Sequence, residues 1–350
     1  MIGQKLSAYR HDLSHHTALS HTTIFMLLAA SIAALVLLNI CWGSVPLSLS
    51  RLWHCLIRPD GSTESLIVWK IRLPRALAGV LCGGGLAVSG LLLQVYFRNP
   101  VVGPFILGIS SGATLMVSLV MLTSIALQIA FLGPFATALA AIAGAYGVMA
   151  VVVAIAARVK NGITLLIMGL MMGYLCHAVT AVLMALAEKQ QVKGFVLWQL
   201  GSFSGFKWIE IWLLAGIGSL LVMSVYLMAK PLNAMLLGEE YALSMGIDVR
   251  RLRMAILFCA CALAGMITSM AGPVAFIGLA VPHMARMVFS TSDNRVLIPA
   301  TLLFGALVAS GCDFAARFLL SPVELPLSAI TAFFGAPVVI RLLMKKQVQL

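Results

Sequence analysis

The chain has 350 residues, of which 61% are hydrophobic and only 10% are charged. A soluble domain carries about 25% charged residues, and no soluble fold of this length could bury so much apolar surface, so lipid must be the solvent for most of the chain. The net charge of +12 does not indicate nucleic acid, because membrane proteins concentrate basic residues in short loops.

The N-terminal segment, residues 1–23, is polar and precedes a first apolar run, Ile24–Trp42. This run is about one bilayer span, roughly 20 residues, and no A-x-A-like cleavage site follows it, so we expect a retained first helix. The seven cysteines are scattered, mostly inside apolar runs, which is typical of small core residues rather than of a metal site or a disulfide framework. They are Cys41, Cys55, Cys82, Cys176, Cys259, Cys261 and Cys312.

Apolar runs with few charges recur along the chain and predict about ten membrane-spanning helices, each of about 20 residues. The expected fold class is therefore all-α, a polytopic integral membrane helical bundle that forms a single transmembrane domain over residues 1–350. Frequent Gly and Pro inside the runs indicate close helix packing. The predicted spans are 22–42, 74–97, 101–123, 133–157, 163–187, 209–229, 252–270, 273–290, 296–320 and 325–344.

The distribution of Lys and Arg between the loops predicts the orientation. With ten spans both termini face the same side, and placing the N-terminus inside puts 14 cations in the inner loops and 9 in the outer ones. The positive-inside rule then favours cytoplasmic N- and C-termini. Nine cations in the outer loops are nevertheless more than this rule leads us to expect, so they are candidates for a specific function.

Between the sixth and seventh spans lies a polar segment, residues 231–253, with the sequence PLNAMLLGEEYALSMGIDVRRLR. Pro231 is predicted to end the sixth span. Three apolar residues, Leu236, Leu237 and Tyr241, fall near one helical face, while Glu239 and Glu240 are polar.

Two glycines, Gly238 and Gly246, bracket a short helix in this segment, and Gly246 is predicted to be its C-cap. Helix physics alone favours an interfacial connector. The alternative is a docking element for a cytosolic partner.

Four blocks in order resemble the permeases of iron-chelate, haem and vitamin B12 ABC importers. Residues 231–253 resemble the coupling loop of that family. The other three blocks resemble its second and third helices, its eighth helix and its tenth helix. They are IRLPRALAGVLCGGGLAVSGLLLQVYFRNPVVGPFILGISSGA (71–113), AGPVAFIGLAVPHMAR (271–286) and ELPLSAITAFFGAP (324–337).

The resemblance implies that the 231–253 segment sits in a groove of a separate ATPase subunit and transmits its movement. The residues that would carry this coupling are Leu236, Leu237, Gly238, Glu239, Glu240, Tyr241, Ala242 and Gly246. The chain itself has no G-x-x-x-x-G-K-[ST] loop, so ATP and Mg are expected on the ATPase subunit and no cofactor is expected on this chain.

Arg72, Arg75 and Arg317 are predicted at the outer ends of spans, where positive charge is disfavoured. They could be anchors that snorkel to the interface. The resemblance instead implies that they dock carboxylates of an extracytoplasmic substrate-binding protein, which suits the planar fork of arginine. Asp313 and Glu324 are also predicted near the outer ends of spans, and the position of Asp313 four residues before Arg317 favours a local ion pair. Arg286, at the inner end of the eighth span, is expected to snorkel to the cytosolic interface.

The fifth span holds the soft side chains Met168, Met171, Met172, Cys176 and His177. In the family that the chain resembles, the pathway is lined largely by the fifth and tenth helices. Methionine is nevertheless an adaptable gap filler, and a lone histidine in an apolar helix is often hydrogen-bonded to a neighbour, so packing is favoured over metal ligation and no metal site is expected.

The resemblance therefore implies the permease subunit of an ATP-driven importer for an iron chelate (siderophore or haem) or cobalamin in a bacterial or archaeal cytoplasmic membrane. It would work by alternating access as a homodimer, with two ATPase subunits and a binding protein. The same scaffold could carry molybdate or a related oxyanion. From other classes, an intramembrane enzyme would need paired acids or a nucleophile dyad within spans, and a channel would need a filter, and neither is evident.

Overall fold

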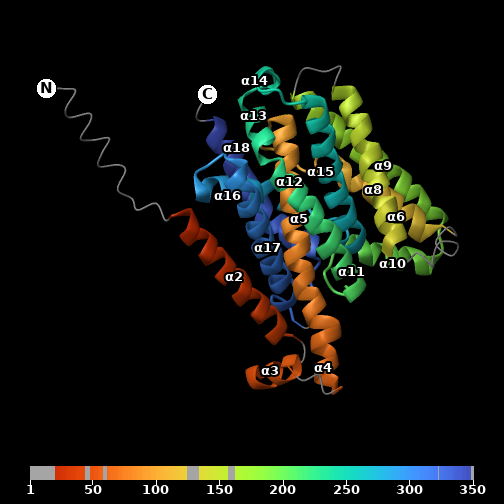
Figure 1. Cartoon of the computed structure of the whole chain (residues 1–350). Helices are drawn as coiled ribbons and strands as arrows, with labels where there is room; N and C mark the ends of the chain where they lie inside the picture. The colour runs from red at the N-terminus through yellow and green to blue at the C-terminus, as the bar shows by residue number, and fades with distance from the viewer. Residues whose placement is uncertain are drawn as a thin grey trace.

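The computed structural model describes residues 20–43, 48–57, 61–123, 134–156, 162–321 and 323–347. Within these ranges the regular structure is helical and no strand occurs, which confirms the all-α fold class (Figure 1). The N-terminal residues up to 19, the loop cations Arg58, Arg158 and Lys160, and three residues at the C-terminus lie outside the described ranges.

Each of the ten predicted spans contains a helix, which confirms the polytopic helical membrane bundle. Among the described residues, seven helices or helical runs are long and apolar enough to cross a membrane, and three shorter apolar helices accompany them. The helices of the ten spans are α2 (His21–Cys41), α5 (Leu73–Phe97), α6 (Ile109–Leu122), α8 (Pro134–Ala156), α9 (Gly162–Leu186), α11 (Trp208–Leu213) continued by the π-helix η3 (Leu214–Gly218) and α12 (Ser219–Leu227), α15 (Val249–Ala271), α16 (Ile277–Phe289), α17 (Asn294–Phe318) and α18 (Leu327–Gln347).

The third and eighth helices are shorter than the sequence predicted. Helix α6 begins at Ile109 instead of residue 101, and α16 begins at Ile277 instead of residue 273. In both cases the residue directly before the helix has a positive φ, Gly108 at +74° and Phe276 at +66°. The chain therefore turns at these two residues before each helix begins, and Gly108 adopts this conformation at no steric cost.

Three helices were not predicted: α3 (Leu49–Ile57), α4 (Thr63–Ile67) and α10 (Lys189–Gln199). Helix α4 continues through the π-helix η1 (Val68–Arg72) into α5, so one helical run covers Thr63–Phe97, 35 residues. At 1.5 Å per residue this run is about 52 Å long, whereas the hydrocarbon core is about 30 Å thick. The run therefore projects from the bundle, and Figure 1 shows α3 and α4 beyond its lower edge.

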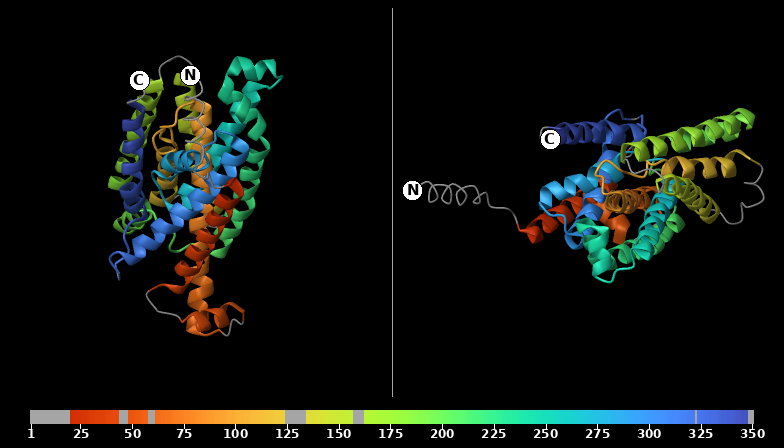
Figure 2. Two further views of the ribbon diagram at one scale, coloured as in Figure 1. Left: turned by 90° about the vertical axis from the view of Figure 1, so that its left-hand side faces the viewer. Right: turned by 90° about the horizontal axis from the view of Figure 1, so that it is seen from above.

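Helix α5 is the centre of the bundle and packs against α15, α16 and α17 (Figure 2). Glycines permit the closest approaches. A Cβ atom on Gly83 would lie 2.3 Å from the carbonyl oxygen of Gly305, and one on Gly90 would lie 1.7 Å from that of Gly278. Larger residues would force these backbones apart. The glycines therefore permit the close helix packing that the sequence predicts.

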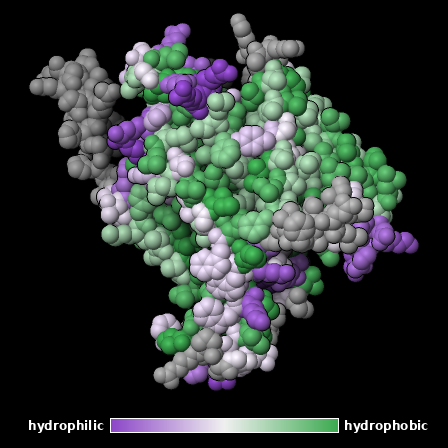
Figure 3. All heavy atoms as spheres, turned by 45° about the vertical axis from the view of Figure 1, so that its right-hand side comes forward, coloured by the Kyte–Doolittle hydropathy of each residue, from purple (hydrophilic) through white to green (hydrophobic). Residues whose placement is uncertain are grey.

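Two short helices, α13 (Ala229–Leu237) and α14 (Glu239–Ser244), lie at the opposite end of the bundle from α3 and α4 (Figure 1). We call these the α14 end and the α3 end. Figure 3 shows hydrophilic side chains gathered at both ends and a hydrophobic belt between them, which is the pattern expected of a protein that spans a bilayer.

Candidate functional site

The polar segment between the sixth and seventh spans folds as α13 and α14, joined at Gly238. Gly238 has φ of +137°, so the chain can turn sharply between the two helices. Pro231 does not end the sixth span as expected. Helix α12 already ends at Leu227, and Pro231 lies in the first turn of α13. Backbone N–H groups in the first turn have no acceptor within the helix, so a proline there removes no hydrogen bond.

Gly246 terminates α14 and confirms the predicted C-cap. Its N–H donates to the carbonyl of Leu243 (2.9 Å), and the N–H of Ile247 donates to the carbonyl of Ala242 (3.1 Å), which is the Schellman arrangement. Gly246 has φ of +78°, as this cap requires. Ile247 packs against a small buried cluster of Ala234, Ala242 and Val249, so the cap also seats α14 on its neighbours.

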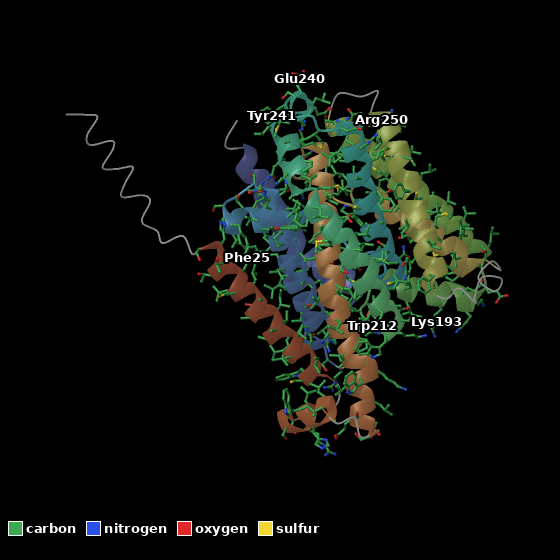
Figure 4. The ribbon with its side chains drawn as sticks, in the orientation of Figure 1. Phe25, Lys193, Trp212, Glu240, Tyr241 and Arg250 are labelled. Carbon is green, nitrogen blue, oxygen red and sulfur yellow. The ribbon has the colours of Figure 1, made fainter. Side chains whose placement is uncertain are left out.

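Large apolar side chains remain exposed on this otherwise polar segment. Leu237 is 72% exposed and Tyr241 is 48% exposed. Figure 4 shows Glu240 and Tyr241 at the tip of the segment and Arg250 nearby. Exposed apolar side chains rimmed by polar ones mark an interaction surface. We call this surface the coupling patch, formed by Leu236, Leu237, Tyr241, Leu243 and Met245.

The structure brings the eight predicted coupling residues together on α13, α14 and their two glycine junctions. Ala242 differs from the others because it is fully buried, and it packs inside the segment instead of facing a partner. Leu243 and Met245 were missed, although both are exposed apolar residues in the same polar segment. Their spacing in the sequence could have identified them.

Polar contacts tie α14 to α15 and α5. Glu239 accepts a hydrogen bond from Arg253 and lies 3.9 Å from the guanidinium of Arg98. The Arg253 guanidinium also lies 5.7 Å from the ring centroid of Tyr96. These side chains are partly exposed, so the ion pairs fix the register of α14 more than they add stability.

Asn233 ties α13 to the beginning of α17. Its amide nitrogen donates to the Asp293 carboxylate (2.6 Å), and its amide oxygen accepts from the backbone and side chain of Asn294 (both 2.8 Å). The backbone N–H of Arg295 and then the Asn233 side chain hold the pKa of Asp293 below its usual range, because both donate to the ionised form. A displacement of α13 would therefore pull directly on α17.

A second cluster of charged side chains lies at the α3 end, centred on Arg75 of α5. Its Nε and Nη2 donate to the Asp313 carboxylate of α17 at 3.0 to 3.2 Å. Its Nη1 donates to both oxygens of Glu324 at 2.9 and 3.1 Å. The side chains of Arg75 and Asp313 are only 8% and 4% exposed, so this is a buried, charge-assisted network.

Arg72 and Arg317 join the same cluster from two sides. Arg72 donates to the carbonyls of Ile40 (2.8 Å) and Cys41 (3.0 Å) at the end of α2. Arg317 donates to the Asn39 side chain and lies 3.4 Å from Asp313, which confirms the predicted local ion pair. The three arginines therefore link α2, α5 and α17.

A cavity of about 440 Å³ opens beside this cluster, and the three arginines and Glu324 line it together with Trp42 and Phe318. The resemblance implies that the arginines are available for docking. Their guanidinium groups are instead engaged by acceptors of the same chain, and Glu324, with its side chain 47% exposed, is the accessible carboxylate. The Arg75 pairs were missed because Asp313 and Glu324 lie 238 and 249 residues further along the chain.

Arg286 does not reach the interface freely as expected, because its Nη1 donates to Gln94 Oε1 at 2.7 Å. On α9, Met171 and His177 are exposed and Cys176 is buried. Among the described residues no group of three His, Cys, Asp or Glu side chains could hold a metal ion.

A family model, curated sequences and a solved structure all match this chain to proteins of membrane transport. Residues 31–345 match the FecCD transport family. The vitamin B12 import system permease protein BtuC of Klebsiella pneumoniae is 35% identical over 282 residues, which cover 81% of this chain and 83% of that protein. BtuC of Salmonella typhi is 35% identical over 280 residues, 80% and 84% of the two chains. A solved structure described as a metal-chelate type ABC transporter in an inward-facing conformation has a TM-score of 0.77 and 27% identity, and the match covers 92% of this chain and 99% of that chain.

Proposed function

The chain belongs to the FecCD transport family of ABC importer permeases, and we propose that it imports an iron chelate (a siderophore complex or haem) or cobalamin. The observation that carries the proposal is the 35% identity to vitamin B12 permeases across four fifths of both chains. The folded coupling patch supports it, because a channel or an intramembrane enzyme has no need of such a surface. Molybdate or a related oxyanion is the alternative cargo on this scaffold.

In this proposal two copies of the chain enclose the cargo pathway in a bacterial or archaeal cytoplasmic (inner) membrane. Two ATPase subunits, which bind ATP and Mg, engage the two coupling patches, and a binding protein delivers cargo at the α3 end. ATP binding and hydrolysis would shift α13, and the contacts of Asn233 would pass that shift to α17. Alternating access then follows as a change in the populations of outward-open and inward-open states.

The exposed faces of α9 and α18 support a pathway between two copies. Only 17% of the apolar stretch of α9 is buried within one chain, and Tyr174 is 62% exposed. On α18, Phe333 is 77% exposed. A cavity of about 340 Å³ beside α9 is lined by Ser111, His177 and other polar side chains, which a pathway for a polar cargo requires.

Reconstitution tests the proposal. The chain, its ATPase subunit and its binding protein would be placed in liposomes, and uptake of cyanocobalamin, a ferric siderophore, haem and molybdate would be measured with and without ATP. We expect ATP-dependent uptake of one of the first three. Uptake of molybdate and of none of the other three compounds would support the alternative cargo. Uptake at the same rate with and without ATP would overturn the importer proposal.

The orientation can be tested independently. We expect a reporter fused after Met344 to be cytosolic and a thiol probe at position 193 to react from outside, because the loop charges favour an inner α14 end. Figure 4 shows Lys193 at the opposite end from Glu240. A cytosolic location for residue 193 would contradict this orientation.

The docking role of Arg72, Arg75 and Arg317 also stays a prediction. We expect added salt to weaken capture of the binding protein, because salt screens the attraction between its carboxylates and the cluster beyond about 10 Å at 0.1 M salt. Each pair with the binding protein would form at the mouth of the cavity, in contact with solvent, so it would contribute on the order of 1 kcal/mol or less. Glu324→Gln should raise the affinity, because it removes the negative charge that now neutralises Arg75 and would repel the carboxylates of the binding protein.

Arg317→Lys should lower that affinity, because it removes the planar fork that suits a carboxylate. Binding-protein affinity for the reconstituted complex is the measurement, with expression level as control. An affinity that is unchanged in both variants and insensitive to salt would remove the cluster from the docking site.

A further inference from the structure

A third cavity with polar lining lies at the α14 end, and the proposed transport cycle does not use it. It has a volume of about 260 Å³ and is lined from the end of α5, from α13, from α16 and from the beginning of α17. Its lining includes Arg98, Asn99, Leu236, Arg286, Ser292 and Asn294. Leu236 belongs to the coupling patch, so whatever occupies the cavity touches the segment that would dock the ATPase.

Arg286 is held rigidly in the wall of this cavity without an acidic partner. Its Nη1 donates to Gln94 Oε1 at 2.7 Å, and Gln94, itself 3% exposed, donates to the carbonyl of Leu279 at 3.1 Å. No described carboxylate lies within 4.0 Å of its guanidinium. A half-buried charge normally has a counter-charge, so this arrangement points to an anion that completes it.

Among the remaining lining residues, Arg98, Asn99 and Ser292 add donors and none is acidic, while the buried Oδ1 of Asn294 is an acceptor without a hydrogen-bond partner. Arg98 has its side chain 43% exposed, and its nearest carboxylate, Glu239 at 3.9 Å, is shared with Arg253. The oxygen of the Asn99 side chain accepts from the N–H of Val101, which leaves its amide nitrogen to donate. The adjacent Asp293 carboxylate is directed to Asn233 and to the first turn of α17.

We propose that this cavity binds a phosphate group, either inorganic phosphate or the headgroup of a phospholipid. Two guanidinium groups, an amide and the hydroxyl of Ser292 approach the cavity from several elements, and a phosphate presents three or four oxygens in different directions, whereas the two oxygens of a carboxylate lie in one plane. The cavity lies at the end of α5 and α16, where a bilayer places its headgroups, so both sources can reach it. The bound phosphate bridges α5, α16 and Leu236 of α13, and it holds the coupling segment against the bundle.

The first experiment uses the full chain, purified in a phosphate-free maltoside detergent and stripped of lipid. Inorganic phosphate is titrated at constant ionic strength with chloride, and the midpoint of thermal unfolding is recorded. A ligand that binds only the folded state raises this midpoint with its concentration. We expect a rise for the wild type and for Arg295→Gln, which removes an exposed charge at the same end outside the cavity, and no rise for Arg286→Gln.

A second arm distinguishes the two sources. If the headgroup is the ligand, protein loaded with phosphatidylglycerol no longer responds to phosphate and retains one more lipid in native mass spectrometry than Arg286→Gln does. If inorganic phosphate is the ligand, the response persists after loading. Both outcomes support the proposal that the cavity at the α14 end binds a phosphate group.

Further variants keep the proposal falsifiable if Arg286→Gln does not fold. Arg98→Gln should weaken the response, and Arg286→Lys should keep part of it because the charge remains. Equal responses of Arg286→Gln and Arg295→Gln would overturn the proposal. So would an absent phosphate response in the wild type together with weaker ATPase binding by Arg286→Gln, because an acidic side chain of the ATPase subunit would then fill the cavity.

Discussion

Replacing Gly246 with valine is expected to abolish ATP-driven uptake while the chain remains in the membrane. The φ of +78° at this position is sterically costly for a residue with a Cβ, by about 1–2 kcal/mol, and more so for a β-branched one. The Schellman cap would be lost, and with it the seat of Ile247 against Ala234 and Ala242. Helix α14 would then no longer present the coupling patch to the ATPase subunit.

Gly246→Asn provides the matched control, because asparagine tolerates the left-handed conformation better than any β-branched residue. The measurements are the amount of ATPase subunit that co-purifies and the rate of uptake in liposomes. We expect both to fall sharply in Gly246→Val and to survive largely in Gly246→Asn. Normal uptake by Gly246→Val would show that the shape of α14 is irrelevant to coupling.

Charge reversal on the same segment should have a related effect through a different cause. In Glu239→Lys with Glu240→Lys, a cation would replace the carboxylate that now lies between Arg253 and Arg98, so α14 would be repelled from α15 and α5. The variant should remain inserted but uncouple ATP hydrolysis from uptake. Retained ATPase binding together with normal transport would contradict the docking role of the segment.

Replacing Arg75 with glutamine is expected to lower the free energy of unfolding by about 3 kcal/mol, because it leaves the Asp313 carboxylate buried with a weaker counter-charge. Arg317 remains 3.4 Å from Asp313, which places the effect at the lower end of the range for breaking a buried pair. The measurement is denaturant unfolding of the detergent-solubilised chain.

Arg51→Gln provides the matched control for Arg75. Arg51 pairs with Glu64 at 2.7 Å at the same end of the bundle, but both side chains are well exposed, so the loss should be about 0–1 kcal/mol. Combining Arg75→Gln with Asp313→Asn should cost less than the two single changes together, because the unpaired buried charge is then removed. Strict additivity, or a small effect of Arg75→Gln, would show that the cluster does not act as a network.

Local features of the chain were predictable from the sequence. Lipid solvation follows from composition, and each apolar run became a helix because a helix satisfies its own backbone within lipid. The short helix between Gly238 and Gly246 was also predictable, because glycine marks the positions where the backbone takes a positive φ. The family followed from four motifs in order. The predicted starts of α6 and α16 were wrong because turns at Gly108 and Phe276 lie inside apolar runs, and hydropathy does not register a turn.

The partners of the charged residues were decided only by the tertiary structure. Hydropathy and helical periodicity indicate on which end of a span Arg75 lies, but its two carboxylates come from α17 and from the residues before α18, more than two hundred positions away. The same holds for Asn233 with Asp293 and for Arg286 with Gln94. Helix packing sets these distances, and packing depends on side-chain shape across several elements, such as the contact of Gly83 with Gly305. The sequence by itself therefore determined which segments lie in lipid and which polar segment is expected to meet the ATPase subunit. The tertiary structure decided which charges neutralise one another and that Arg286 has no acidic partner among the described residues.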